Sequence, residues 1–213
     1  MKIAIIGSGI SGLTAAYILS RKNDITVFEK NDYIGGHTHT HEIEEEGTTV
    51  SVDSGFIVYN ERTYPNFINI LNKLGVQSQL TRMGFSVKSE KDNLEYAGHS
   101  LDGLFAQRSN LMRPSFLKIL YGMARFNSRA RKDLPYLIPE VTLGEYLHSN
   151  NYSKEFIANY IIPIGAAIWS TAPDDMLEIS AIFFIRFFDN HGLLQVIDRP
   201  NWWVIKGGSK KYI

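Results

Sequence analysis

The order of apolar and polar positions predicts a strand, a helix and a second strand at the start of the chain. Residues 2–6, KIAII, form a short apolar run rich in β-branched side chains, typical of a buried parallel strand. Residues 13–22 carry helix formers without proline, and residues 24–30, DITVFEK, are typical of a second strand. We therefore expect an α/β fold with a Rossmann-like domain, whose parallel sheet is incomplete because few further parallel strands follow.

The pattern changes after residue 62 and becomes mainly helical. The predicted elements are a helix at 64–75 that ends at Gly75, two short strands within 85–98, and helices near 114–132, 142–149, from 153 with Pro163 interrupting, and 176–188. Thr142 and Glu145 have the spacing of a capping box. The pattern therefore predicts three regions: a first domain at 1–62, a mixed, mainly helical region at 63–200, and a return toward the first domain at 201–213.

A glycine-rich turn, GSGISG, lies between the first strand and the helix. This context turns a G-x-G-x-x-G match into a dinucleotide-binding fingerprint, with the pyrophosphate at the helix N-terminus. Glu29 follows 22 residues after Gly7, where a carboxylate can accept both hydroxyls of an adenosine ribose and would repel the 2′-phosphate of NADP. The candidate contacts are Gly7, Gly9, Ile10, Ser11, Gly12 and Glu29. This unit alone does not separate NAD from FAD.

The stretch EKNDYIGGHT, residues 29–38, resembles the flavin-dependent amine oxidoreductase superfamily, which includes monoamine oxidases, protoporphyrinogen oxidases and phytoene desaturases. In that superfamily a basic residue and then a Gly-Gly doublet follow the glutamate. His37 stands where arginine is commoner, and offers a hydrogen bond without a fixed charge. With VDSGFIVYN and WWVIKGGSKKYI, the chain is similar to a bacterial branch of predicted NAD/FAD-binding proteins. The resemblance adds Lys30, Gly35, Gly36, His37 and Thr38 as cofactor contacts.

The resemblance implies FAD as the cofactor, bound by the dinucleotide-binding region at 1–62. It also implies that the mainly helical region at 63–200 is an insertion that binds the substrate. It implies an oxidoreductase that removes a hydride equivalent from a C–N or C–C bond of an apolar, lipid-like substrate. Asp53 and Gly55 match an Asp-x-Gly motif near the flavin ring, where Ser54 and Gly55 would offer backbone amides; the alternative is an Asx turn capped by Asp53. The candidate pocket residues are Tyr59, Asn60, Trp169, Phe184 and Phe188. No side chain is predicted to be catalytic.

Three histidines alternate in GGHTHTHEIEEEG, so His37, His39 and His41 would share one face of a strand. Such a face can bind zinc, but Glu42 and Glu44 point the other way and no further ligand is evident. We therefore expect no metal site and a solvated hairpin that turns at Gly47. The roles of His39 and His41 stay open. In DNHG, His191 is expected to stabilise a turn rather than to act as an acid or base.

The charge balance, the lack of cysteine and the absence of long apolar runs limit the partners and chemistry that this chain can have. Lysine plus arginine equals aspartate plus glutamate, 22 each, which does not favour a nucleic-acid partner. The absence of cysteine excludes disulfides, a catalytic thiol and a flavin tethered through sulfur. No signal peptide or long apolar run is evident, so a cytoplasmic location is expected. The segment 108–132 contains seven basic and no acidic residues; a peripheral membrane contact is the alternative to the favoured helix with one face in the core.

The last residues, KGGSKKYI, predict a helix start with Ser209 as the N-cap. The resemblance implies about as much sequence again, so we expect the chain to be the N-terminal part of a larger protein whose other half completes the flavin site. Two alternatives remain open: an NAD-dependent dehydrogenase that shares only the first strand–helix–strand unit, and a non-catalytic nucleotide-binding module.

Overall fold

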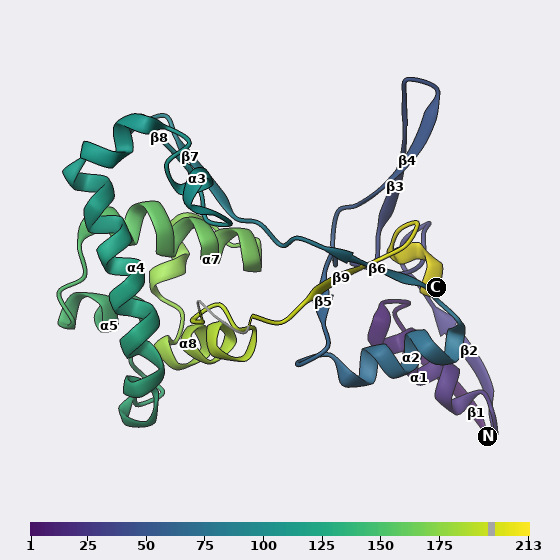
Figure 1. The fold of residues 1–213 in the computed structure, drawn as a ribbon. Coiled ribbons are helices and arrows are strands. Elements are labelled where there is room, and N and C mark those ends of the chain that lie inside the picture. The colour runs from purple at the N-terminus through teal and green to yellow at the C-terminus, as the bar shows by residue number, and fades with distance from the viewer. Residues whose placement is uncertain (196–198) are drawn as a thin grey trace. The chain divides into compact units, whose positions relative to one another are not determined.

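The computed structural model of the chain describes residues 1–195 and 199–213. The chain divides into two compact units, labelled by their helices and strands in Figure 1. Unit 1 comprises residues 1–82 and 201–213, and unit 2 comprises residues 83–200. Unit 2 is therefore an insertion between two segments of unit 1. The division places residues 63–82 in unit 1, whereas the sequence pattern puts the first boundary at 62.

Unit 1 begins with strand β1 (Lys2–Ile6), helix α1 (Ile10–Leu19) and strand β2 (Asp24–Phe28). The strands are parallel and in register, Lys2 opposite Asp24 and Ile6 opposite Phe28. The predicted parallel pairing is confirmed, but the predicted burial of the first strand is wrong. Ile6 is 82% exposed and Phe28 54% exposed, and α1 has no buried residue. The physical reason is that this sheet contains only β1 and β2 among the described residues.

The expected solvated hairpin is present. Strands β3 (Thr40–Glu45) and β4 (Thr48–Asp53) pair antiparallel, with Glu45 opposite Thr48. The two turn residues, Glu46 and Gly47, have φ values of 49° and 77°, as a tight hairpin with right-handed strand twist requires. The hairpin is exposed over most of its length.

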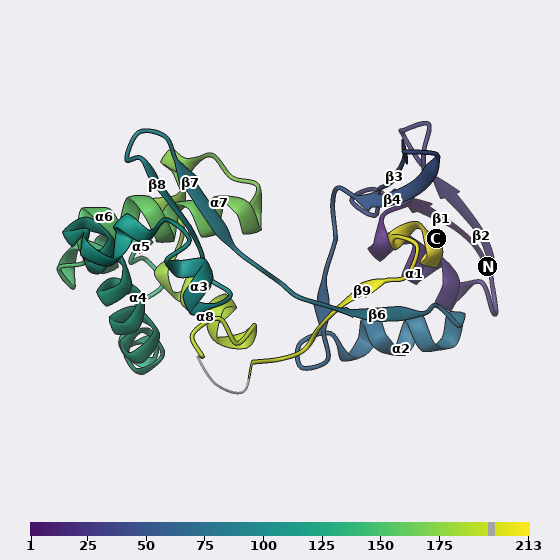
Figure 2. The same cartoon turned by 45° about the horizontal axis from the view of Figure 1, so that its top comes forward.

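A three-stranded sheet closes unit 1. Its order is β5 (Tyr59–Asn60), β9 (Trp202–Ile205) and β6 (Ser78–Thr81), and both neighbours pair antiparallel with β9. Helix α2 (Pro65–Leu74), which ends at Gly75, runs beside β6 in Figure 2. Four side chains form the small core, namely Tyr59, Leu71, Ile205 and Tyr212. Because Leu71 of α2 joins that core, residues 63–82 belong with unit 1.

Unit 2 is mainly helical. Its elements are β7 (Ser86–Ser89), β8 (Leu94–Ala97), α3 (Leu101–Leu104), η1 (Arg108–Met112), α4 (Pro114–Asp133), η2 (Leu134–Tyr136), α5 (Leu143–Ser149), α6 (Lys154–Phe156), η3 (Ile157–Ile161), α7 (Ile162–Trp169), η4 (Pro173–Leu177) and α8 (Ala181–Asn190). The predicted strand pair at 85–98 and the capping box are present, and the box makes both of its hydrogen bonds. Helix α8 starts later than predicted, since residues 173–177 form a 3-10 turn.

Pro163 does not break the chain's helical path. A π-helical turn, η3, precedes α7, and the Ile162 amide donates to the Ile157 carbonyl. Proline has no amide to donate, and its ring crowds the preceding turn. The wider turn places the proline at the start of α7 rather than within a regular helix.

The core of unit 2 gathers around Phe126 of α4, which is fully buried. The rings whose centroids lie 5.9–6.4 Å from the Phe126 ring are those of Tyr146, Tyr152, Phe156, Phe184 and Phe188. Edge-on aromatic contacts at such distances add to the energy of apolar burial. Residues from α4, α5, α6 and α8 thus share one core.

Helix α4 has the predicted buried face, formed by Phe116, Ile119, Gly122, Phe126 and Ala130. Several of its basic groups contact other parts of unit 2: Lys118 pairs with Glu155, Arg131 with Asp189, and Arg125 lies over the Tyr152 ring. Over residues 1–195 and 199–213, the helices are too short or too polar to cross a membrane.

Candidate functional site

The backbone conformation of the turn between β1 and α1 requires glycine at positions 7 and 12. Gly7 adopts φ +96° and donates from its amide to the Phe28 carbonyl at 2.7 Å. A Cβ atom at Gly12 would lie 2.0 Å from the Gly7 carbonyl oxygen. Gly12 therefore lets α1 pack against the turn, and Gly7 lets the chain make it.

The start of α1 has the features of an anion site. Gly9 is the N-cap, and no side chain caps the helix. The first helical bond runs from the Leu13 amide to the Gly9 carbonyl, so the amides before Leu13 point out of the helix end. A Cβ atom at Gly9 would meet nothing within 4 Å. Ile10 and Ser11, both exposed, begin the helix at this open space.

Glu29 is anchored beside the turn. Its Oε2 atom accepts hydrogen bonds from the Ser8 amide at 2.9 Å and from the Ser8 hydroxyl at 2.5 Å. Its Oε1 atom accepts from the amides of Lys30 at 2.8 Å and Asn31 at 2.9 Å. These bonds, above all that from Asn31 and then those from Ser8, lower the pKa of Glu29 to about 2. The group is a firmly ionised carboxylate at the end of β2.

The Gly35–Gly36 loop lies against the glycine turn. Gly9 and Gly35 form a parallel β-bridge, and the Gly35 amide donates to the Ser8 carbonyl at 3.1 Å and to its hydroxyl at 3.2 Å. Gly36 has φ +60°, and a Cβ atom there would lie 3.2 Å from the Gly9 Cα atom. The two glycine motifs, 26 residues apart in the chain, thus form one backbone surface.

The residues after the loop are mostly engaged within unit 1. His37 is exposed, whereas Thr38 is 5% exposed and its hydroxyl bonds to the Tyr212 hydroxyl at 2.9 Å. The Ser54 amide donates to the His39 carbonyl at 3.0 Å, and its contact with a flavin stays a prediction. A Cβ atom at Gly55 would lie 1.9 Å from the His37 carbonyl oxygen, so Gly55 allows the two segments to cross.

Two of the three alternating histidines, His39 and His41, are in ring contact. The rings of Tyr33 and His39 lie parallel with centroids 4.5 Å apart, and the His41 ring is 4.1 Å from that of His39. His41 also bonds through Nε2 to the Ser54 hydroxyl at 3.0 Å. In the described part of the chain, no three histidines or carboxylates lie close enough to hold a metal ion.

Asp53 caps a turn that lies far from it in sequence, at residues 209–212. Its carboxylate accepts from the Ser209 amide at 2.9 and 3.0 Å and from the Ser209 hydroxyl at 2.8 Å. The 3-10 turn η5 (Ser209–Tyr212) therefore has Gly208 as its N-cap, and the prediction of Ser209 as the cap is wrong. The physical reason is that the Ser209 hydroxyl and amide both donate to the Asp53 carboxylate, so the hydroxyl is engaged there rather than with the later amides of the turn.

Of the predicted pocket residues, Trp169 is half-buried and the other four are buried. Tyr59 is 5% exposed and donates to the Ser78 hydroxyl, and Asn60 is fully buried, its Oδ1 accepting from the amides of Arg62 and Thr63. In unit 2, Phe184 and Phe188 are fully buried and stack on each other in the core. Trp169 is half-buried against the rings of Phe183, Phe184 and Phe187.

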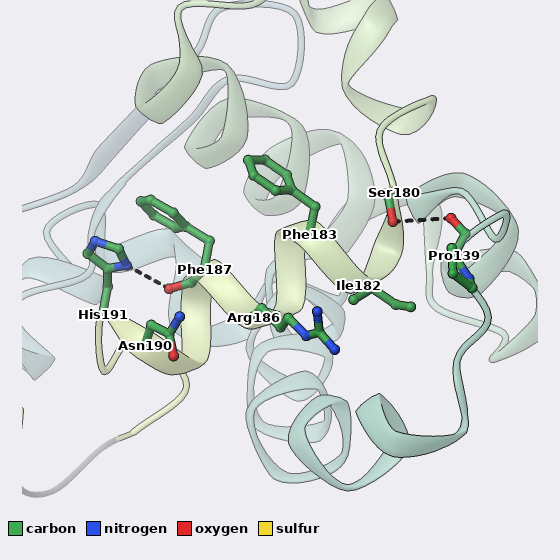
Figure 3. A pocket seen from close by; sticks show the side chains of 8 residues that line it. All are labelled: Pro139, Ser180, Ile182, Phe183, Arg186, Phe187, Asn190 and His191. Carbon is green, nitrogen blue, oxygen red and sulfur yellow. Dashed lines mark hydrogen bonds between the residues drawn. The ribbon is translucent and has the colours of Figure 1, made fainter. Parts of the chain in front are cut away.

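Unit 2 has a hollow of about 420 Å³ beside α8 (Figure 3). It is lined by Pro139, Ser180, Ile182, Phe183, Arg186, Phe187, Asn190 and His191. Phe183 and Phe187 project from the same side of the helix in Figure 3. His191 stacks on Phe187 and bonds to its carbonyl at 2.8 Å, so it ends α8 as expected, and burial lowers its pKa. Phe183 and Phe187 line the hollow, whereas the predicted pocket residues Phe184 and Phe188 do not.

Comparisons with known proteins agree with this geometry. Residues 5–74 match the family model of the NAD(P)-binding Rossmann-like domain. A flavin-dependent L-tryptophan oxidase of Lentzea aerocolonigenes is 32% identical over 80 residues, which are 37% of this chain and 17% of that protein. A 1-hydroxycarotenoid 3,4-desaturase of Flavobacterium is 56% identical over 43 residues, 20% of this chain and 9% of the desaturase.

The structure of cyclohexylamine oxidase from Brevibacterium oxydans matches 99% of this chain, with a TM-score of 0.66 and 20% identity. These matches agree with the predicted resemblance to the flavin-dependent amine oxidoreductase superfamily. The likeness of the structures confirms the expected fold, a Rossmann-like unit with a mainly helical insertion. The chain covers 47% of that oxidase structure, about half its length.

Sequence reasoning missed Ser8 and Tyr212, whose hydrogen bonds connect the glycine turn, Glu29 and the Gly35–Gly36 loop with the end of the chain. Ser8 is 1% exposed and bonds both Glu29 and Gly35, and Tyr212 is 8% exposed and bonds Thr38. Ser8 could have been predicted, because it stands between two glycines of the nucleotide-binding turn. No local pattern marks Tyr212, because its partner lies 174 residues away.

Proposed function

We propose that this chain carries the adenosine and pyrophosphate part of an FAD site in an oxidoreductase similar to amine oxidases and carotenoid desaturases. The observation that carries the proposal is the meeting of Gly9 with Gly35 and Gly36 beside the uncapped start of α1. Two glycine segments in contact leave room for an extended cofactor along the backbone. A nicotinamide dehydrogenase would not require the second glycine pair.

The chain's own groups have separate roles in this proposal. The amides at the start of α1 bind the pyrophosphate, because they are unpaired donors at the positive end of the helix. Glu29 binds the ribose hydroxyls and disfavours a 2′-phosphate. Its oxygens already accept four hydrogen bonds, so the ribose replaces some of the donors from Ser8, Lys30 and Asn31. The bound flavin supplies the hydride acceptor.

The proposed reaction removes a hydride equivalent from a C–N or C–C bond of an apolar, lipid-like substrate, in the cytoplasm. The names of the relatives support both bond types, since they include an amino-acid oxidase and a carotenoid desaturase. Apolar lining in the hollow of unit 2, from Ile182, Phe183 and Phe187, supports the substrate's apolar character.

Titration of the purified chain with FAD, followed by quenching of flavin fluorescence, tests the proposal. Binding that ADP competes away and that Gly9→Val abolishes is expected, since the new side chain enters the open space at the start of α1 that the pyrophosphate would occupy. Gly84→Ala is the control, because a Cβ atom there meets nothing within 4 Å. Binding of NAD without FAD would instead indicate a dehydrogenase. FAD that binds but is not bleached by amine or polyene substrates would indicate a non-catalytic module. Undiminished FAD binding by Gly9→Val would contradict the proposed site.

A further inference from the structure

One carboxylate joins two segments of unit 1 that lie 156 residues apart. Asp53 ends β4 and accepts two bonds from the Ser209 amide and one from the Ser209 hydroxyl. Thr40, its cross-strand partner, donates to Asp53 at 2.5 Å and accepts the Lys210 amide at 3.0 Å. Asp53 and Thr40 thus bind the first two amides of the turn η5. Charged acceptors at such amides make strong hydrogen bonds.

The same turn contacts the diglycine loop. The Tyr212 hydroxyl bonds to the Thr38 hydroxyl at 2.9 Å, and both side chains are buried. A Cβ atom at Gly35 would lie 2.4 Å from the Ile213 Cδ1 atom, so this face of the loop rests on the end of the turn. The Tyr212 ring is held in turn by Phe67 of α2, with centroids 5.3 Å apart.

The diglycine loop is therefore held from two sides. Ser8 accepts the Gly35 amide on the nucleotide side, and Gly36 contacts Gly9 there. Tyr212 and Ile213 contact Thr38 and Gly35 on the other side. Both glycines of the loop have positive φ values, 111° and 60°, a backbone region that glycine enters without steric cost and that local geometry alone does not fix.

We propose that Asp53 is a positioning residue for the cofactor loop: through the turn Ser209–Ile213 it holds Gly35 and Gly36 against Gly9. The inference rests on the proposed function, since the loop matters only if a nucleotide binds there. Asp53 itself need not touch the cofactor. Its carboxylate fixes the turn, the turn fixes Thr38 and Gly35, and the loop then presents a preorganised backbone to the ligand.

The test compares Asp53→Asn with a matched carboxylate variant of the same hairpin, Glu44→Gln. Glu44 is exposed and accepts from Thr49 across the strands, near the hairpin tip. Two readouts are measured: the Kd for FAD by fluorescence quenching, and amide hydrogen exchange at residues 35–38 without ligand. Asp53→Asn should raise the Kd about tenfold, because the charge that strengthens the bonds from Ser209 and Thr40 is lost. It should also speed exchange in the loop, whereas Glu44→Gln should match the wild type in both readouts.

A wild-type Kd together with wild-type exchange in a folded Asp53→Asn protein would overturn the inference. If the wild-type chain does not bind FAD, the proposed function fails, but the exchange measurement still decides whether Asp53 orders the loop. If Asp53→Asn does not fold, Tyr212→Phe replaces it, since this change removes only the bond to Thr38. Faster exchange at Thr38 and a Kd raised a few-fold are then expected. Unchanged values in Tyr212→Phe would overturn the inference equally.

Discussion

Ser8 donates two hydrogen bonds to a single oxygen of Glu29, one from its amide and one from its hydroxyl. The same hydroxyl accepts the amide of Gly35 at 3.2 Å, and Ser8 is 1% exposed. The end of β2, the glycine turn and the diglycine loop are therefore connected through one buried side chain. These hydrogen bonds fix the backbone of the proposed site through contacts within the chain.

The lowered pKa of Glu29 makes the stability of unit 1 depend on pH. The carboxyl has a pKa of about 2 in the folded chain against an ordinary value of 4.5. Its folded pKa is depressed, so its contribution is fully present above pH 4.5 and is lost as the pH falls toward 2. Glu29→Gln should therefore be less stable than the wild type at pH 6. Urea denaturation at a series of pH values should show the difference shrinking below pH 4.5, and a difference that does not depend on pH would contradict the assignment.

Substitutions at two glycines of the same motif, Gly12 and Gly9, should affect folding and FAD binding separately. Gly12→Ala places a Cβ atom 2.0 Å from the Gly7 carbonyl oxygen and should cost about 1–3 kcal/mol of folding free energy. Gly9→Val enters open space in the free chain and should leave the unfolding transition nearly unchanged, while FAD binding is lost. Thermal unfolding and FAD titration of both variants check this. Equal destabilisation by the two substitutions would show that Gly9 serves the fold rather than a ligand.

Gly122 allows α4 and α6 to approach closely. A Cβ atom at this position would lie 2.4 Å from the Phe156 ring, and Phe156 is fully buried. Gly122→Ala should destabilise unit 2 by about 1–3 kcal/mol through overpacking, although alanine is the better helix former. Chemical denaturation measures the loss. The comparison is Gly84→Ala, which meets no neighbour and should change stability by less than about 0.5 kcal/mol.

The capping box at the start of α5 gives a further measurable effect. The Thr142 hydroxyl accepts the Glu145 amide at 3.1 Å, and the Glu145 carboxylate accepts the Thr142 amide at 2.9 Å. Thr142→Ala should cost about 0.5–2 kcal/mol in denaturant unfolding. Ser128→Ala, which removes an exposed hydroxyl bonded within α4, should have little effect. A cost below that of Ser128→Ala would mean that packing of Leu143 and Leu147 holds this helix without its cap.

Local pattern predicted much of this fold because the signals are local. The glycine spacing and flanking apolar runs identify β1, α1 and β2, and the capping box identifies α5. The turn at Gly47 is predicted by the short run of polar residues around this glycine, which has a positive φ. In each case the residues that determine the structure are close together in sequence.

The sequence could not show what depends on distant partners. Ser209 has the type and position of an N-cap, yet Asp53, 156 residues away, takes that role. Phe184 and Phe188 have the composition of a pocket wall, but helical periodicity alone does not tell which face of α8 meets the core. The prediction that β1 is buried was wrong for the same reason, since burial of this strand depends on strands and helices other than β1 and β2.

The exposed ends of β1 and β2 have a practical consequence. Ile6 and Phe28 lie opposite each other, largely open to water, and each strand of this pair has a free edge among the described residues. Open edges with apolar side chains favour intermolecular pairing. Concentrated preparations of the chain should therefore self-associate, increasingly so in salts such as sulfate that strengthen apolar contacts. A charged side chain in place of Ile6 should extend the concentration range in which it stays monomeric.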